Sequence, residues 1–258
     1  MVAYSTHQGN RRMADTVATQ IEELILDGVI RPGELLPSER RLCDKLGVSR
    51  ASLREGLKVL RGKGIIDTRQ GRGSVVARLI PPRDDSPLMH LFRDHPRTLY
   101  DLLEVRTLLE GESARLAALR GTPADRVIIT RRYEEMVDYV RGAGEIDVER
   151  LARFDHGFHL AICEASHNPV LVYTLQGLTD LLLSSVFASV KNLYHRPAPR
   201  EQINRQHERL FRAVIDQDAD LAREAALEHL TSIGDSLREI EAEDERLVRS
   251  AMRLEAWQ

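Results

Sequence analysis

Hydrophobic residues in the first third of the chain recur at helical spacing, interrupted by short turn signals. In residues 14–27 they stand one and two turns apart, at Val17, Ile21, Leu24 and Ile25. This spacing predicts an amphipathic helix that Gly28 ends. Ser38 is a predicted N-cap for a second helix that stops at Gly47, and Ser49 is a predicted N-cap for a third. The pattern therefore predicts three helices, the last two joined by a tight turn.

The third predicted helix has an apolar side and a basic side. Its apolar residues are Leu53, Leu57 and Leu60, and its basic stripe consists of Arg50, Arg54, Lys58 and Arg61. Such a helix packs with one side and presents positive charge with the other. Arg50 and Arg54, near its start, are placed to contact base edges or phosphates in a major groove. Gly56 is less helix-favouring than Ala and costs about 1 kcal/mol of helix preference.

After the third helix the period changes from helical to extended. Residues 65–69 and 74–77 predict two strands around a glycine-rich turn at residues 70–73. Glycines at such a tip let the backbone approach a phosphate or enter a minor groove, with Arg69 and Arg72 beside it. Helix, turn, basic helix and hairpin together predict a winged helix-turn-helix whose partner is double-stranded DNA.

The distribution of charge agrees with a DNA partner. Residues 1–80 carry 14 Lys and Arg against 9 Asp and Glu, whereas residues 81–258 carry 23 against 31. A chain of net charge −3 therefore concentrates its positive charge on the predicted DNA-binding segment, which favours attraction to phosphate.

The remainder of the chain predicts a linker and a helical bundle. Three prolines and paired charges at residues 80–87 forbid regular structure and mark a linker over residues 81–97. Helical periodicity then predicts six helices and no strand, at residues 98–120, 123–141, 146–166, 169–194, 199–217 and 219–247. The predicted fold class is mainly α, with a winged helix-turn-helix domain over residues 1–80 and an all-helical bundle over residues 98–258.

Cysteine usage and hydropathy bear on the setting of the protein. Cys43 and Cys163 are the only cysteines, one in each predicted domain, so a disulfide framework is not expected. No apolar run has the length of a signal peptide core or of a spanning helix. We therefore expect a cytoplasmic protein without a membrane partner.

Four polar side chains interrupt the apolar stripes of three predicted bundle helices: Asp155, His159, His207 and His229. Burying them without partners would cost several kcal/mol, whereas one cation satisfies all four. Asp155 and His159 lie one helical turn apart, as two ligands of one ion must. The alternative is that each histidine is bonded to backbone or to Asp155. The ligand types suit Zn, Ni, Fe or Mn, and the sequence does not choose among these divalent metals.

Arg106 interrupts a further apolar stripe in the helix predicted over residues 98–120. A guanidinium among leucines requires a carboxylate, and Glu110 lies one turn away. The alternative is that Arg106 faces the metal cavity and binds the carboxylate of a small organic acid.

The segments RPGELLPSERRLCDKLGVSRASLREGL and GIIDTRQGRGS resemble the DNA-binding domain of GntR-family regulators, in the FadR branch. The branch carries a C-terminal helical ligand domain called FCD. The resemblance implies that this chain contacts DNA through positions on the second and third helices and the wing tip. With the neighbouring serines and the wing arginine, the predicted DNA-contacting set is Arg40, Ser49, Arg50, Ser52, Arg54, Arg69, Gly71 and Arg72.

The resemblance also covers the C-terminal domain. On the same three helices this chain has the pattern Asp-x-x-x-His, His, His, which resembles that of family members with an FCD domain. The resemblance implies that the metal ligands are Asp155, His159, His207 and His229. His156, His167 and His195 are expected to lie outside that site. The segments HPRTLYDLLEVRTLLEGESARLAALRGT and RSAMRLEAWQ are similar to members that control glycolate-utilisation genes, and imply glycolate as effector and activation as outcome. Lactate- and pyruvate-responsive members share the first of these segments, and the likewise similar FHLAICEASHNPVLVYTLQGLTDLLLSSVFASVKNLYHRP, less fully.

The predicted function is therefore a ligand-controlled transcription regulator, a homodimer that sets two recognition helices on a palindromic operator. A metalloenzyme is the alternative from another class. No positioned general base or nucleophile accompanies the predicted metal site, so we do not expect an enzyme. A third interpretation is a dimerisation module with an inert core.

Overall fold

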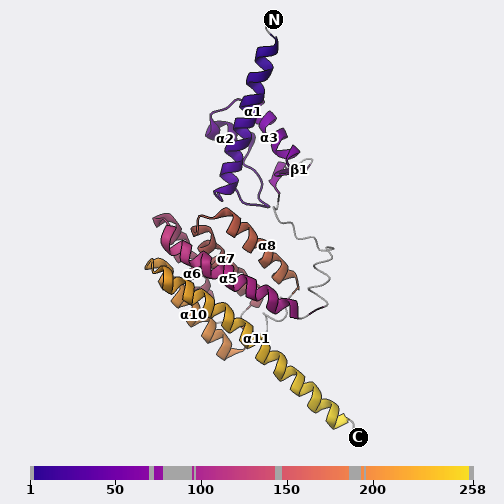
Figure 1. Ribbon diagram of the computed structural model, residues 1–258, viewed down its shortest axis with the longest axis vertical. Coiled ribbons are helices and arrows are strands. Elements are labelled where there is room, and N and C mark those ends of the chain that lie inside the picture. The colour runs from indigo at the N-terminus through magenta and orange to yellow at the C-terminus, as the bar shows by residue number, and fades with distance from the viewer. Residues whose placement is uncertain are drawn as a thin grey trace. The chain divides into compact units, whose positions relative to one another are not determined.

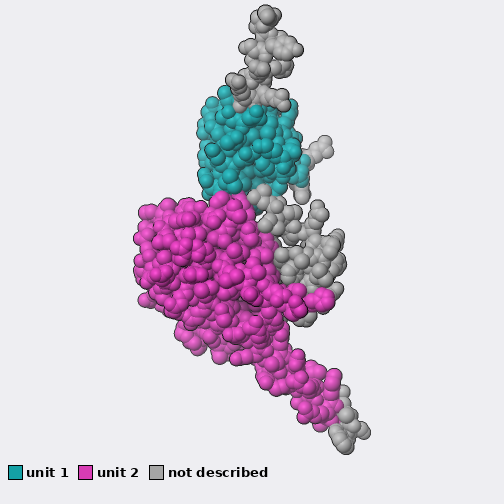
Figure 2. Space-filling view, viewed as in Figure 1, with its two compact units in different colours: residues 1–81 teal, residues 82–258 magenta. Residues whose placement is uncertain are grey.

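The structure is a computed structural model of the 258-residue chain. It describes residues 3–69, 73–77, 95, 97–142, 147–185, 193–194 and 196–255, without the side chains of residues 3–12, 69, 180–185 and 255. The chain forms two compact units, Met1–Pro81 and Pro82–Gln258 (Figure 2).

Unit 1 contains three helices, α1 (Ala3–Leu26), α2 (Glu39–Leu46) and α3 (Arg50–Gly62). The predicted caps are present: Ser38 accepts a hydrogen bond from Arg41 N at 3.4 Å, and Ser49 accepts one from Ser52 N at 3.1 Å. Gly47 ends α2 with a left-handed φ of 65°, which glycine adopts without steric cost. Helix α1 begins well before residue 14, because apolar periodicity marks only the part of a helix that packs on a core.

The wing of unit 1 is an antiparallel hairpin of β1 (Ile66–Arg69) and β2 (Gly73–Val76). Its register pairs Ile66 with Val76 and Arg69 with Gly73. A third extended segment, which the sequence pattern did not predict, joins this hairpin through a β-bridge between Leu35 and Val75. Residues 70–72, which include the predicted DNA contacts Gly71 and Arg72, lie outside the described residues.

Close packing between α1 and α3 explains Gly56. A Cβ atom at this position would lie 2.6 Å from Val17 Cγ1 and 3.2 Å from the Ala14 carbonyl oxygen. Val17 is fully buried and β-branched, so it cannot move aside cheaply. The glycine therefore permits a helix contact that alanine would obstruct, and its lower helix preference is offset by packing.

Unit 2 contains six helices and no strand within its described residues, as predicted. They are α5 (Arg97–Arg120), α6 (Pro123–Arg141), α7 (Val148–Ala165), α8 (Pro169–Ser185), α10 (Pro197–Ile215) and α11 (Ala219–Glu255). Helix α10 begins at Pro197 rather than at residue 199, because proline suits the first helical position, where no N–H bond is required. Helix α11 continues beyond the predicted residue 247. The predicted linker falls largely outside the described residues.

The core of unit 2 lies between α5, α7, α10 and α11. Helix α11 packs against α5 and α10, and α6 packs against α7 (Figure 1). Gly111 on α5 allows α11 to approach closely, since a Cβ there would meet Leu227 Cδ2 at 2.8 Å. None of the described helices combines the length and apolar character that crossing a membrane requires.

The contact at Gly56 generates a matched test. Gly56→Ala should lower the opening free energy of α3 by about 1–2 kcal/mol, because overpacking outweighs the gain of up to about 1 kcal/mol in helix preference. Gly62→Ala, in the same helix with no atom within 4 Å of the added Cβ, should leave that free energy unchanged or raise it. Hydrogen–deuterium exchange of α3 peptides in the full chain measures both, and equal effects would contradict the packing explanation.

Candidate functional site

Three imidazoles meet in the core of unit 2. His159 comes from α7, His207 from α10 and His229 from α11. One ring nitrogen of each could bind a metal ion, and these three nitrogens lie within 4.8 Å of one another. The Nε2 atom of His207 lies 3.2 Å from Nε2 of His159 and 3.2 Å from Nε2 of His229. We call these three residues the imidazole cluster. The sequence prediction placed these side chains on apolar helix faces, and the fold brings them together.

Asp155, one turn before His159 on α7, joins the cluster. Its Oδ1 atom lies 3.1 Å from His207 Nε2 and 3.9 Å from His159 Nε2. This oxygen is buried and neither contact has hydrogen-bond geometry, so within the described part of the chain it has no donor. The four residues predicted as metal ligands therefore converge from three helices, and two of their buried polar atoms, Asp155 Oδ1 and His207 Nδ1, have no hydrogen-bond partner among the described residues.

The outward nitrogens of two imidazoles are held by acceptors. His159 Nδ1 lies 3.0 Å from Glu110 Oε2, and His229 Nδ1 lies 3.4 Å from Gln206 Oε1. When each Nδ1 donates, the lone pair of the ring remains on Nε2, where the three rings meet. The sequence pattern did not identify Gln206, because a glutamine next to a buried histidine has no periodic signal.

Arg106 and Glu110 on α5 extend this network. Arg106 Nε donates to Glu110 Oε1 at 2.8 Å, and Arg106 Nη2 donates to the same oxygen. The sequence left two possible partners for Arg106, Glu110 and the carboxylate of a small organic acid. In the structure its partner is Glu110. Both side chains are nearly buried, with 13% and 10% exposure. The described contacts thus run from Arg106 through Glu110 to His159.

Electrostatics in the network favour the ionised form of both carboxylates. Burial alone would raise the pKa of Glu110, but Arg106 and His159 outweigh it and lower that pKa to about 2. Burial would also raise the pKa of Asp155, yet the neighbouring imidazoles hold it below its ordinary value. Both carboxylates are therefore charged at neutral pH.

The imidazole pKa values move in opposite directions. Burial lowers the pKa of His207, and burial together with the other two rings lowers that of His229 further. For His159 burial also acts downward, but Glu110 and Asp155 outweigh it and raise the pKa. The lowered pKa values favour neutral rings at His207 and His229, which is the form that binds metal, whereas a cation would have to displace a proton from a charged His159. Burial also raises the pKa of Tyr194, whose hydroxyl hydrogen-bonds Asp155 and was missed from the sequence.

The separations in the cluster fit the ligand set of one cation. Nitrogen ligands about 2.1 Å from a cation lie about 3.0 Å apart in octahedral geometry and about 3.4 Å apart in tetrahedral geometry. The observed separations of 3.1–3.2 Å around His207 Nε2 fall in this range, whereas the 3.9 Å between His159 Nε2 and Asp155 Oδ1 is longer. The unsatisfied Asp155 oxygen and the converging lone pairs are both groups that a cation would satisfy.

Two of the three histidines that were expected to lie outside the site are described. His167 is exposed at the junction of α7 and α8 and contacts Asp125 Oδ2 at 2.9 Å. His156 is half-buried on α7 and does not belong to the imidazole cluster. His195 lies outside the described residues.

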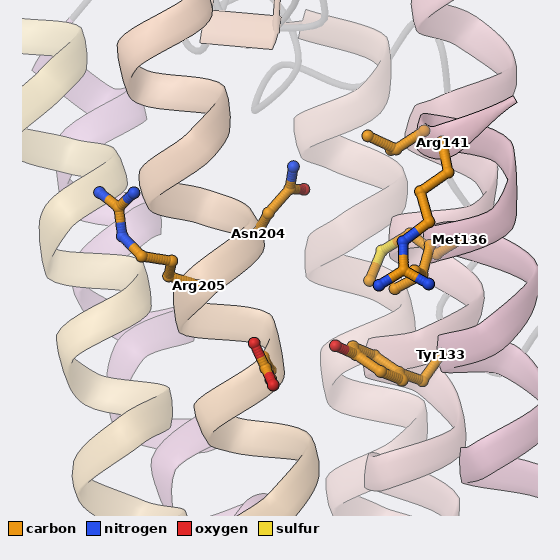
Figure 3. Close-up of a pocket in the computed structure, with 8 residues that line it drawn as sticks. Tyr133, Met136, Arg141, Asn204 and Arg205 are labelled. Carbon is orange, nitrogen blue, oxygen red and sulfur yellow. The ribbon is translucent and has the colours of Figure 1, made fainter. Parts of the chain in front are cut away.

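A surface hollow of about 180 Å³ between α6 and α10 is separate from the cluster. Figure 3 shows Tyr133 and Arg141 of α6 on one side and Asn204 of α10 on the other, with the Arg205 guanidinium directed away from them. Glu208, which also lines the hollow, is bound by Arg212. The hollow shares no residue with the imidazole cluster, and its acidic group already has a partner.

The predicted DNA-contacting residues of unit 1 lie on α2, on α3 and at the wing. Arg40 and Arg50 are exposed, and neither has a partner among the described residues. Arg54 is exposed and bonded to Glu39 of α2, while Ser52 Oγ lies 3.0 Å from the cap residue Ser49. Arg69 ends β1, but its side chain lies outside the description.

Family models assign both units. Residues 13–76 match the gntR family of bacterial regulatory proteins, and residues 101–232 match the FCD domain. A winged helix-turn-helix followed by an all-helical FCD domain defines this class, and the chain belongs to the gntR family of transcriptional regulators. The families and relatives it matches are regulators rather than enzymes.

Individual relatives place the chain within the family. It is 58% identical to the Glc operon transcriptional activator of Escherichia coli (strain K12), over 95% of this chain and 96% of that protein. It is 32% identical to the galactonate operon transcriptional repressor of the same organism, over 88% of this chain and 97% of that protein. Among solved structures, Streptococcus agalactiae GntR has a similar fold, with a TM-score of 0.54, 24% identity, and coverage of 86% of this chain and 99% of that one.

The buried pair on α5 generates a stability test. Glu110→Gln should lower the free energy of unfolding by about 3 kcal/mol, because it removes the charge opposite the nearly buried Arg106. Glu112→Gln on the same helix removes the charge opposite Arg115, where both side chains are about a third exposed or more, and should cost less than about 1 kcal/mol. Urea unfolding of both variants measures the difference, and a similar cost for the two would contradict the role assigned to burial.

Proposed function

We propose that this protein is a ligand-responsive, DNA-binding regulator that activates glycolate-utilisation genes as a homodimer on operator DNA. One observation carries the proposal: four metal-ligand side chains converge inside the helical unit of a chain whose other unit is a winged helix-turn-helix. The likeness to the Glc operon transcriptional activator supports glycolate and activation. Residues 81–97 are proposed to link the two units.

The residues proposed to hold a divalent cation are Asp155, His159, His207 and His229. A bound cation would supply positive charge and open coordination positions for a small oxyanion. Glu110 and Gln206 act on the site indirectly, because they accept from the Nδ1 atoms of His159 and His229 and keep the Nε2 lone pairs directed inward. Zn, Ni, Fe and Mn all suit this donor set.

Arg106 is the residue proposed to bind the effector carboxylate. Its Nε and Nη2 atoms contact Glu110, and its Nη1 atom has no partner among the described residues. A small 2-hydroxy acid offers a carboxylate to such a donor and a hydroxyl to the neighbouring site. Glycolate is the proposed effector, and lactate and pyruvate are the alternatives of similar chemistry.

The contacts of Arg106 suggest how effector binding reaches the rest of unit 2. A carboxylate at Arg106 competes with Glu110, and Glu110 also orients His159. Glu110 adjoins Gly111, against which Leu227 of α11 packs. A ligand that alters the Glu110 contacts therefore acts at the junction of α5 and α11. Any resulting change in DNA affinity must be matched by an equal change in effector affinity.

The metal and effector sites are tested together by thermal shift. A divalent cation should raise the melting temperature of chelator-treated protein, and glycolate should raise it further only when the cation is present, because both bind the folded state. His207→Asn should lose both increments, whatever its own stability. His156→Asn, on α7 but outside the cluster, should keep both.

The outcomes of this experiment separate the possibilities. A normal increment in His207→Asn would remove the metal proposal. Increments with lactate or pyruvate but none with glycolate would change the effector. Stabilisation by the cation without any effect of an acid would remove the effector proposal. No increment from any cation, and no loss on Asp155→Ala, would favour a dimerisation module with an inert core.

The recognition helix is tested by DNA binding. Arg50→Ala and Arg54→Ala should each weaken binding to operator DNA by about 1–3 kcal/mol, because bidentate base contacts contribute this much discrimination. Arg61→Ala, in the last turn of the same helix, removes an equal charge away from the N-terminal end and should mainly reduce the salt dependence. Fluorescence anisotropy over a range of salt concentrations measures the three variants, and unchanged operator affinity for both Arg50 and Arg54 variants would exclude this recognition helix.

A further inference from the structure

Glu39 of α2 holds the side chain of Arg54 on α3. The Nε–H group of Arg54 is shared between the two Glu39 oxygens, at 3.2 Å from Oε1 and 3.1 Å from Oε2. The two residues are 15 positions apart in the chain, so the contact joins two helices. Both side chains are exposed, at 66% for Arg54 and 42% for Glu39.

The geometry of this contact leaves the two terminal nitrogens of the Arg54 guanidinium free of partners among the described residues. Glu39 is bonded to Nε alone, and the Nη1 and Nη2 atoms of Arg54 have no partner among the described residues. The two terminal nitrogens are the fork that binds the O6 and N7 atoms of guanine. Glu39 therefore fixes the side chain from behind without occupying the atoms that recognise a base.

The carboxylate of Glu39 lies on the predicted DNA-binding surface, where a negative charge is unfavourable. It repels DNA phosphates and weakens the general attraction of the basic unit. Arg40 and Arg50, the other exposed arginines of these two helices in the predicted set, have no acidic partner within the described residues. The acidic contact is thus specific to Arg54 and is not a property of every arginine on this face.

We propose that Glu39 is a positioning residue for sequence discrimination, which fixes Arg54 so that its terminal nitrogens meet one base pair. The proposal rests on the proposed DNA-binding function of α3. An arginine held in place before binding loses less side-chain freedom when it meets the base, so the gain appears in specific binding. Non-specific binding, which needs only positive charge, gains nothing from this order and is weakened by the carboxylate.

The test compares two alanine variants of the full chain that each remove one negative charge from unit 1. Glu39→Ala breaks the contact with Arg54, whereas Glu55→Ala on α3 removes a carboxylate that is paired with Lys58 at 2.7 Å. The probes are a DNA duplex selected by the unaltered protein from a randomised pool and a shuffled duplex of the same composition. The quantity compared is the discrimination ratio, which is the dissociation constant for the shuffled duplex divided by that for the selected duplex.

Glu39→Ala should reduce this ratio about three- to tenfold, the loss expected when one side chain must be ordered during binding. Binding to the shuffled duplex should stay equal or become tighter in both variants, because each loses a negative charge. Glu55→Ala should keep the ratio of the unaltered protein. Glu39→Gln, which retains an acceptor for Nε–H, should recover part of the loss.

The double variant Glu39→Ala/Arg54→Ala distinguishes the roles. It should have the same ratio as Arg54→Ala, because Glu39 acts only through that side chain. A further loss in the double variant, or an unchanged or higher ratio in Glu39→Ala, would overturn the proposal. If Arg54→Ala itself left the ratio unchanged, the recognition helix would be wrong, which is a failure of the proposed function. Melting temperatures equal to that of the unaltered protein show that the variants are folded.

Discussion

The charged network in the core of unit 2 is the constraint on which the arrangement of its helices depends. Two carboxylates, a guanidinium and three imidazoles lie largely away from water, and each must meet a partner or destabilise the fold. Arg106 and Glu110 satisfy each other, and Glu110 in turn fixes His159. Helices α5, α7, α10 and α11 can therefore pack only in the rotation and register that bring these groups together.

Unit 1 places its charge in the opposite way. Its fully buried residues are apolar within the described part of the chain, and the arginines of α2 and α3 are exposed, so packing must hold the helices that carry them. Gly56 sets the approach of α3 to α1, and the caps at Ser38 and Ser49 fix where α2 and α3 begin. Contacts such as that between Glu39 and Arg54 then order individual side chains on this scaffold.

Local signals in the sequence predicted most of the fold, and the tertiary contacts set its limits. The caps and Gly47 are local features, so they located α2 and α3 closely, and polar residues on apolar stripes identified the imidazole cluster. Gln206 contacts His229 and Tyr194 contacts Asp155, and such contacts between distant parts of the chain leave no period in the sequence. The need for a glycine at position 56 could not be predicted either, because it arises from residues of α1. The pairing of Leu35 with Val75 of β2 was likewise not predicted.

The small size of the proposed effector explains why such a network would be assembled before binding. Glycolate has only a handful of non-hydrogen atoms, and at a ceiling of ~1.5 kcal/mol per atom its total binding energy is on the order of 7 kcal/mol. A coupling of ~1–3 kcal/mol to DNA binding must come out of that total. Little then remains to bring charged groups into a dry core. Glu110 and Gln206 already orient the rings, so the ligand need not supply the energy of assembling the site. The Nη1 atom of Arg106 remains available to bind its carboxylate.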